Sequence, residues 1–224
     1  MASHDKSALN WSLREEIAPT TEPVTLIEAK LHLRVDTASD DTLITALIVA
    51  ARLQIEKETK RTLVTTSWKL TQDVFPGHIG GHNFHDNRHI DHSRHGVSSL
   101  GIDLDVPPIQ SVTTVKYFDT DGSQQTLVAG TDYQVDTEGE PGRLLPAIDK
   151  DWPDTQSGRL NAVEVIYVAG YGAASTVPQL LKQAILWLVT AMYEQRSDTT
   201  DCTVVLLPKG VDRIIGNYRL WVAV

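Results

Sequence analysis

The chain has 224 residues, 41% hydrophobic and 22% charged, a balance typical of a globular protein with a buried core. Its formal net charge of −9 argues against a protein that coats nucleic acid, because such a protein needs Lys and Arg to displace counterions. The single cysteine, Cys202, excludes an intramolecular disulfide framework, and no apolar run approaches the roughly 18 residues that a membrane span requires.

The chain begins with a polar stretch, residues 1–23, for which we expect a flexible arm. It has no basic segment followed by an apolar one, so we expect no secretion signal. Thr25 and Glu28 then have the spacing of a capping box, which predicts a short, mostly apolar helix over about 25–35.

A longer helix is predicted over 40–61. Its apolar residues recur at steps of one, three and four, at Leu43, Ile44, Leu47, Ile48, Ala51 and Ile55. Acidic residues stand at its start and basic residues at its end, which is the charge distribution that the helix dipole favours.

The pattern changes to that of strands over about 62–170. Thr, Val and aromatic residues are frequent, and apolar residues alternate with others, as at Val163, Val165 and Tyr167. Asp121 and Gly122 form a pair that supplies the positive φ of a tight hairpin. We predict an antiparallel, β-rich insertion module bounded at 62–171.

Helical patterns return after the strands, over 177–196 and 211–219. The first carries a broad apolar stripe, and residues 206–224 form a C-terminal helix and an apolar tail. The predicted fold class is α+β, with a small helical core, residues 24–61 plus 172–219, interrupted by the β-rich module.

Six of the eight histidines lie between His78 and His95. On a helix they would share one face, and two or three could bind zinc or nickel, with His82, His85, His89 and His92 as candidates. Glycines flank the run and strong helix formers are scarce, so we favour a hydrophilic loop over 78–96 between two strands. A metal site and a pH-responsive role stay open as alternatives.

Sequence motifs of nucleotide-binding loops, serine hydrolases and zinc proteases are absent from the chain. The glycines of AGYGAA, residues 169–174, fall between a strand and a helix, where they are expected to shape a turn. No cofactor is predicted.

Several stretches taken in order resemble one family. They are EPVTLIEAKLHLRVD, SWKLTQDVFP, PPIQSVTTVKYFDTDG, DYQVDTEGEPGRLLP, VIYVAGYG, VPQLLKQAILWLVTAMYEQR and LPKGVDRIIGNYRLW. Together, over about 21–221, they look like the head–tail connector (adaptor) proteins of tailed bacteriophages and prophages, in the variant that carries a β insertion. Such relatives have few residues between the FP turn and the following strand. In this chain a segment of roughly residues 78–99 is inserted there, so the resemblance gives the histidines no role.

The resemblance implies a structural virion protein rather than an enzyme. Such adaptors are made in the bacterial host cytoplasm and form a ring, commonly a dodecamer of neighbouring adaptor subunits, beneath the portal protein in the virion neck. The ring extends the DNA channel without sequence-specific binding and docks the next stopper or tail protein. No membrane is involved.

The C-terminal segment of such adaptors commonly reaches towards the portal, which would place residues 206–224 there. The apolar tail and its neighbours are residue types that anchor interfaces. We predict partner contacts by Arg213, Tyr218, Arg219, Leu220, Trp221, Val222 and Val224. Packing of this segment onto the chain's own helices is the alternative.

Two other functions remain open from the sequence. One is a metal-dependent enzyme that uses the histidine loop, which stoichiometric bound metal would reveal. The other is a carbohydrate- or surface-binding β module, which helices on both sides make less favoured. If acidic residues line a DNA channel, they would repel phosphate and reduce sticking during passage.

Overall fold

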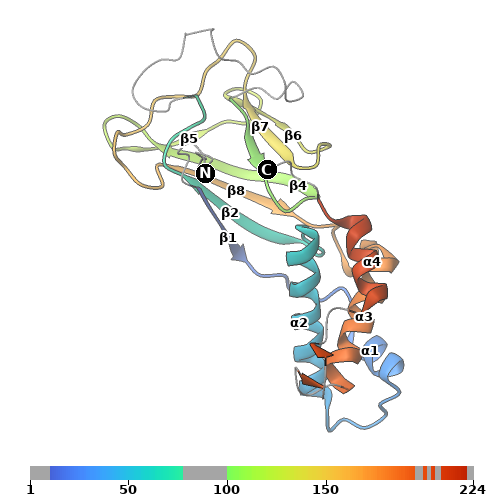
Figure 1. Cartoon of the computed structure of the whole chain (residues 1–224). Helices are drawn as coiled ribbons and strands as arrows, with labels where there is room; N and C mark the ends of the chain where they lie inside the picture. Colours follow the sequence, from blue (N-terminus) through green and yellow to red (C-terminus); the bar gives the residue numbers. More distant parts are fainter. Residues whose placement is uncertain (1–10, 78–99, 195–198, 201–202, 205–207, 221–224) are drawn as a thin grey trace. The chain divides into compact units, whose positions relative to one another are not determined.

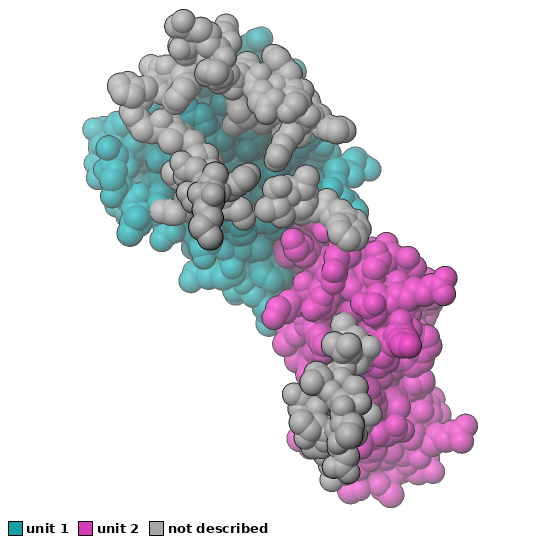
Figure 2. Space-filling view, viewed as in Figure 1, with its two compact units in different colours: residues 1–18, 66–105, 109–168 teal, residues 19–65, 106–108, 169–224 magenta. Residues whose placement is uncertain are grey.

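The computed structural model describes residues 11–77, 100–194, 199–200, 203–204 and 208–220. The chain divides into two compact units, coloured separately in Figure 2. The β unit comprises residues 1–18, 66–105 and 109–168, and the helical unit comprises 19–65, 106–108 and 169–224. The α+β class predicted from the sequence is confirmed.

The helical unit contains four α-helices, labelled in Figure 1, within the described residues. They are α1 (Leu26–Leu33), α2 (Asp41–Thr59), α3 (Gln179–Glu194) and α4 (Lys209–Tyr218). A short 3-10 helix, Ala174–Thr176, precedes α3, and strands β9 (Thr199–Thr200) and β10 (Thr203–Val204) pair antiparallel before α4.

The ends of the first two helices follow local chemistry. The Thr25 hydroxyl accepts a hydrogen bond from Glu28 N–H at 3.2 Å, and the Glu28 carboxylate accepts one from Thr25 N–H at 2.6 Å. The predicted capping box is therefore present. Arg34 and Lys60 adopt left-handed φ values of 57° and 55°, which end α1 and α2 slightly before the predicted limits.

The core of the helical unit is formed by apolar faces of all four helices. Its fully buried members include Ala29 of α1, Ile44 and Ile55 of α2, Ile185 of α3 and Val211 of α4. Packing of α1, α2, α3 and α4 around this shared core leaves each helix one face turned outward.

The β unit holds two sheets. A five-stranded sheet has the order β1-β2-β8-β4-β5, and a three-stranded sheet has the order β3-β7-β6 (Figure 1). The strands are β1 (Trp11–Ile17), β2 (Thr66–Gln72), β3 (Ile102–Leu104), β4 (Ile109–Phe118), β5 (Gln124–Leu127), β6 (Tyr133–Asp136), β7 (Gly142–Pro146) and β8 (Val163–Ala169).

Aromatic packing fills the interior of the β unit. Phe75 stacks on Trp152 with ring centroids 4.7 Å apart, and Tyr117 meets Phe75 edge-on at 5.7 Å. Tyr167 is fully buried, and its hydroxyl donates to the Asp105 carbonyl oxygen at 2.8 Å. Burial raises the pKa of the Tyr167 phenol, so the hydroxyl stays a donor.

The expectation of a flexible arm over residues 1–23 does not hold at Trp11–Ile17. This segment forms β1 and pairs antiparallel with β2, with Trp11 opposite Gln72 and Leu13 opposite Leu70. Nearly all of its side chains are exposed, so it lacks the alternation of buried and exposed residues that marks a strand in sequence. The chain therefore enters the β unit before it builds the helical unit.

Residues 106–108 lie within the predicted β module but belong to the helical unit. The Pro107 carbonyl oxygen accepts from Thr62 N–H at 3.0 Å, and the Pro108 carbonyl oxygen accepts from Gly170 N–H at 2.8 Å. Gly170 has φ +120°, and a Cβ there would lie 2.4 Å from the Val64 carbonyl oxygen. This close backbone approach requires glycine, in agreement with the turn predicted at AGYGAA.

Candidate functional site

The last described residues of the chain are fastened to the C-terminal end of α2. Leu220 N–H donates to the Thr59 carbonyl oxygen at 2.9 Å, and Arg219 Nε donates to the Glu58 carbonyl oxygen at 3.0 Å. The final carbonyls of a helix have no partner within the helix, so these two bonds cap α2 from the C-terminal segment. Arg61 Nε also donates to the Tyr218 carbonyl oxygen at 2.6 Å.

This attachment bears on the residues predicted to bind a partner. Leu220 is only 8% exposed, and Arg219 also reaches the Glu58 carboxylate at 2.7 Å, so both contact their own chain. Arg213 is exposed on α4, and its side chain is available at the surface. Tyr218 is half-buried and packs against the core of the helical unit. Trp221, Val222 and Val224 lie outside the described residues, and contact with a partner remains a prediction for all seven.

A glycine allows helix α4 to pack close to α3. A Cβ on Gly210 would lie 2.6 Å from Cζ3 of Trp187, so the absence of a side chain lets the α4 backbone approach the indole ring. Val211, Ile214 and Ile215 of α4 are buried in the core of the helical unit. These contacts hold α4, and with it the last described residues, on the core of the helical unit.

A buried ion network braces α2 near its C-terminal end. Arg52 is 5% exposed, and its guanidinium lies 2.8 Å from the Glu22 carboxylate and 2.7 Å from that of Glu56. Glu56 also accepts a hydrogen bond from Leu63 N–H at 2.8 Å. Burial raises the pKa of the Glu56 carboxyl, while the Leu63 bond and Arg52 oppose that rise. The network joins the segments before and after α2.

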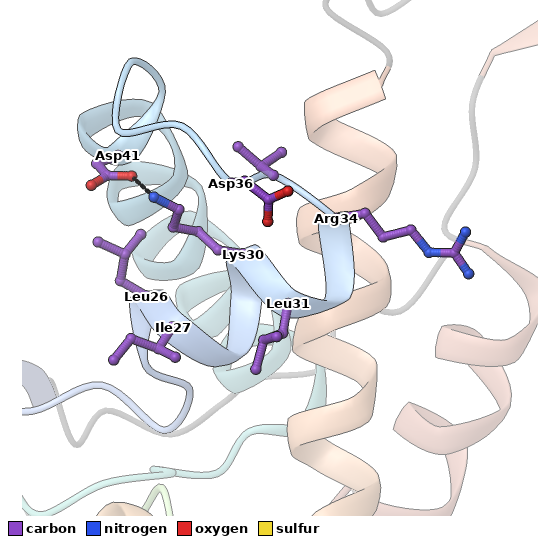
Figure 3. A pocket seen from close by; sticks show the side chains of 8 residues that line it. Leu26, Ile27, Lys30, Leu31, Arg34, Asp36 and Asp41 are labelled. Carbon is purple, nitrogen blue, oxygen red and sulfur yellow. Dashed lines mark hydrogen bonds and ion pairs between the residues drawn. The ribbon is translucent and has the colours of Figure 1, made fainter.

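A hollow of about 520 Å³ lies beside α1, shown in Figure 3. Lys30 Nζ lies 2.6 Å from Asp41 Oδ1 and donates to the Thr37 carbonyl oxygen at 2.9 Å. The only ammonium lining the hollow is thus paired with the carboxylate at the start of α2. This pairing ties α1 to α2.

The outward faces of α1 and α2 carry exposed apolar side chains. Ile27 and Leu31 of α1 are 72% and 75% exposed, and Leu43 and Leu53 of α2 are 42% and 48% exposed. A surface helix usually places polar or charged residues opposite its core face. Exposed apolar residues that share one face of a helix mark a contact with another molecule.

The sequence places these four residues in the predicted helices 25–35 and 40–61, and assigns none of them to an interface. The signal lay in the spacing, because Ile27 and Leu31 are four residues apart and fall on the opposite side of α1 from Ala29, which is fully buried. Since the sequence does not say which side packs inward, it could not separate core residues from interface residues.

Metal chemistry finds no support within the described residues. They contain no group of three or more His, Cys, Asp and Glu placed to hold a metal ion. The candidates His82, His85, His89 and His92 lie outside them, so the structure does not bear on those four.

Among the described segments, no helix is long and apolar enough to cross a membrane.

Comparison with known proteins supports the resemblance seen in the sequence. Residues 23–83, which include α1, α2 and β2, match the model of the phage gp6-like head-tail connector protein family. No curated protein sequence matches the chain.

Three solved structures share the fold over most of both chains. A chain from the neck of an empty gene transfer agent (GTA) particle computed with C6 symmetry has a TM-score of 0.71 at 20% identity, covering 95% of this chain and 97% of that one. Chains from the virion of a native GTA particle and from its neck computed with C12 symmetry have TM-scores of 0.68 and 0.63 at 21% and 22% identity, with the same coverage. At these identities the likeness establishes the fold.

Proposed function

We propose that this protein is a structural adaptor of a virion neck, assembled as a ring under the portal. The observation that carries the proposal is the fold match over 95% of the chain to neck proteins of a phage-like particle, in structures computed with C6 and C12 symmetry. The match of residues 23–83 to the phage gp6-like head-tail connector family model agrees with it. On this proposal the protein performs no turnover and binds no cofactor.

The helical unit supplies the features that a ring subunit needs. Its core is built from residues of all four helices. Its outward faces on α1 and α2 nonetheless carry exposed leucine and isoleucine, which a neighbouring subunit would bury. A rigid core with apolar outer faces fits a component of a permanent assembly.

The portal contact is assigned to the end of the chain. Because Arg219 and Leu220 cap α2 within the chain, the segment after them starts from a fixed place in the helical unit. We assign the contact to Arg213 on the exposed side of α4 and to the tail residues Trp221, Val222 and Val224. The DNA would pass through the ring without sequence-specific contacts, and the opposite end of the ring would dock the next neck protein.

Binding to the cognate portal protein tests this assignment. Deletion of residues 221–224 leaves the bond between Leu220 and Thr59 in place, so the thermal midpoint should not change while portal binding falls at least tenfold. Arg213→Glu should weaken binding in the same assay, and Lys209→Glu, at another exposed position of α4, serves as its matched control. Full portal binding by both the deletion and Arg213→Glu would contradict the assignment.

A further inference from the structure

The outward face of α2 is apolar over most of the helix. On the face opposite the buried Ile44, Ile48 and Ile55, no charged residue occurs before Lys57. The side chains of this α2 face are Thr42, Leu43, Ala46, Val49, Ala50 and Leu53. A helix that is apolar on two opposite sides is normally covered on both, and the described part of this chain covers only one.

Small side chains lie between larger ones on the α2 face. Ala46 and Ala50 are exposed and small, and they lie between the larger side chains of Leu43 and Leu53. At a rise of about 1.5 Å per residue, the two leucines are about 15 Å apart along the axis. Small residues between large ones let a second helix approach closely.

Two apolar side chains that could contact such a face project from α1 of the same unit. Ile27 and Leu31 extend from the same side of α1 in Figure 3, and both are more than 70% exposed, at 72% and 75%. The eight residues of α1 span about 12 Å, which fits between the two leucines that bound the α2 face. The spacing of four residues between Ile27 and Leu31 equals that between Ala46 and Ala50.

We propose that α1 of one copy docks on the α2 face of a second copy, and that repetition of this contact closes the ring. The proposal rests on the function proposed above. Both surfaces turn away from the core that α1 and α2 share, so the pairing joins different copies. A contact between two different faces is heterologous, and such contacts form rings when the rotation between copies closes.

The charges at the ends of the two surfaces fix the direction of the docked helix. Glu28 and Arg34 stand at the N- and C-terminal ends of the α1 surface, and Lys57 stands at the C-terminal end of the α2 face. Asp40, at the start of α2, accepts a hydrogen bond from the Tyr193 hydroxyl of α3 and so faces the core side. If α1 runs antiparallel to α2 of its neighbour, Glu28 approaches Lys57, whereas the parallel direction brings Arg34 to Lys57. Neither Arg34 nor Lys57 has a side-chain ion pair with another described residue, so both are available.

The antiparallel direction also sets which residues meet. Leu31 should lie over Ala46 and Ile27 over Ala50, since each pair is four residues apart on its own helix. With the parallel direction, Leu31 would meet Ala50 instead and Arg34 would face Lys57, a like charge. Electrostatic complementarity at Lys57 therefore favours the antiparallel direction.

Site-directed crosslinking of the full chain in assembled rings tests the contact. In a Cys202→Ser background, the double variant Leu31→Cys/Ala46→Cys should give, with a short bismaleimide, a ladder of covalent oligomers that ends at the closed ring. Each single variant should stay monomeric on a denaturing gel, because neither surface meets its own copy. Leu31→Cys/Lys57→Cys, which places the second thiol at the far end of the face, serves as a matched control.

A charge introduced at Ala50, on the α2 face, provides an independent test of the contact. Ala50→Lys should leave the thermal midpoint of the isolated chain unchanged, because Ala50 is exposed, and should reduce ring assembly at least tenfold. Thr45→Lys, on an exposed flank of the same helix, should assemble normally. Rings that form without the Leu31–Ala46 crosslink and tolerate Ala50→Lys would overturn this interface and leave the proposed function intact. Failure to form rings even with the portal protein would overturn both.

Discussion

Arg219 Nη2 lies 2.7 Å from Glu58 Oε2, and Arg219 Nε donates to the carbonyl oxygen of the same residue at 3.0 Å. One guanidinium thus binds both the side chain and the backbone of the penultimate residue of α2. With Leu220 N–H on the Thr59 carbonyl oxygen, the chain's last described residues cap the helix that also carries the apolar α2 face. The cap and the proposed subunit contact therefore share one rigid helix.

Removing the arginine should cost more than removing its carboxylate partner. Arg219→Ala loses both bonds, whereas Glu58→Ala keeps the bond to the backbone carbonyl, and the ion pair is partly exposed on both sides. We expect a loss of about 1 kcal/mol for Arg219→Ala and about 0.5 kcal/mol or less for Glu58→Ala. Urea unfolding measures both, and equal losses would mean that the backbone bond contributes nothing.

The two glycines of α4 should respond to alanine in opposite directions. Gly210→Ala places a Cβ 2.6 Å from the Trp187 ring, and overpacking of this kind costs about 1–3 kcal/mol. Gly216 has no heavy atom within 4 Å of its Cβ position, so Gly216→Ala should stabilise the helix by about 0.5–1 kcal/mol.

Thermal unfolding of the two variants checks this pair of signs, and Trp187→Leu combined with Gly210→Ala should recover part of the loss. Destabilisation of similar size at both positions would show that α4 does not approach Trp187 as described.

The buried ion network should make stability depend on pH once Arg52 is removed. Burial raises the folded-state pKa of Glu56 above its ordinary value of 4.5, so the folded chain holds this proton more tightly than the unfolded chain. The contribution of Glu56 is therefore most favourable below that value and declines as pH rises through the folded pKa. Arg52→Met removes the charge that favours the ionised carboxylate, which raises this pKa further and enlarges the decline.

We expect Arg52→Met to cost about 3–5 kcal/mol near pH 7 and to regain part of that stability at pH 5. Urea midpoints at the two pH values measure the effect. In Arg52→Met/Glu56→Gln the titrating carboxyl is absent, so the regain should disappear, and its persistence would assign the pH dependence to another group.

Shortening the histidine loop should leave the β unit folded. Gly77 and Leu100 lie on either side of residues 78–99, and a Cβ on Gly77 would be 2.7 Å from Leu100 Cδ2, so the two ends of the segment are in contact. Replacement of residues 78–96 by a short glycine-containing turn should keep the circular dichroism spectrum and thermal midpoint. Collapse of the fold would identify a structural site there, and stoichiometric metal in the untagged, chelator-washed full chain would revive the metal-site hypothesis.

The helices were predictable because their signals are local. Thr25 and Glu28 fix the start of α1 through a capping box, and the apolar period of α2 includes Ile44, Ile48 and Ile55, which the structure buries. Strand β8 was equally visible, since Val163, Val165 and Tyr167 alternate and all three are buried.

Strand β1 and the outward faces of α1 and α2 could not be predicted from such local patterns. Trp11 and Ile17 are exposed, and β1 is held by backbone bonding to β2, which leaves no pattern in the side chains. Ile27 belongs to a predicted apolar helix, but apolar character alone does not say whether a side chain meets its own chain or another. The predicted tail residue Leu220 shows the converse, since it is buried in its own unit.

Native mass measurement of the full chain with its cognate portal protein would show whether this chain forms a ring on a portal. We predict a complex in which a closed ring, a dodecamer of this chain, joins one portal. We also predict that Ala50→Lys reduces ring assembly at least tenfold at unchanged thermal stability of the isolated chain. A chain that remains monomeric in the presence of excess portal would show that it is not a ring-forming adaptor.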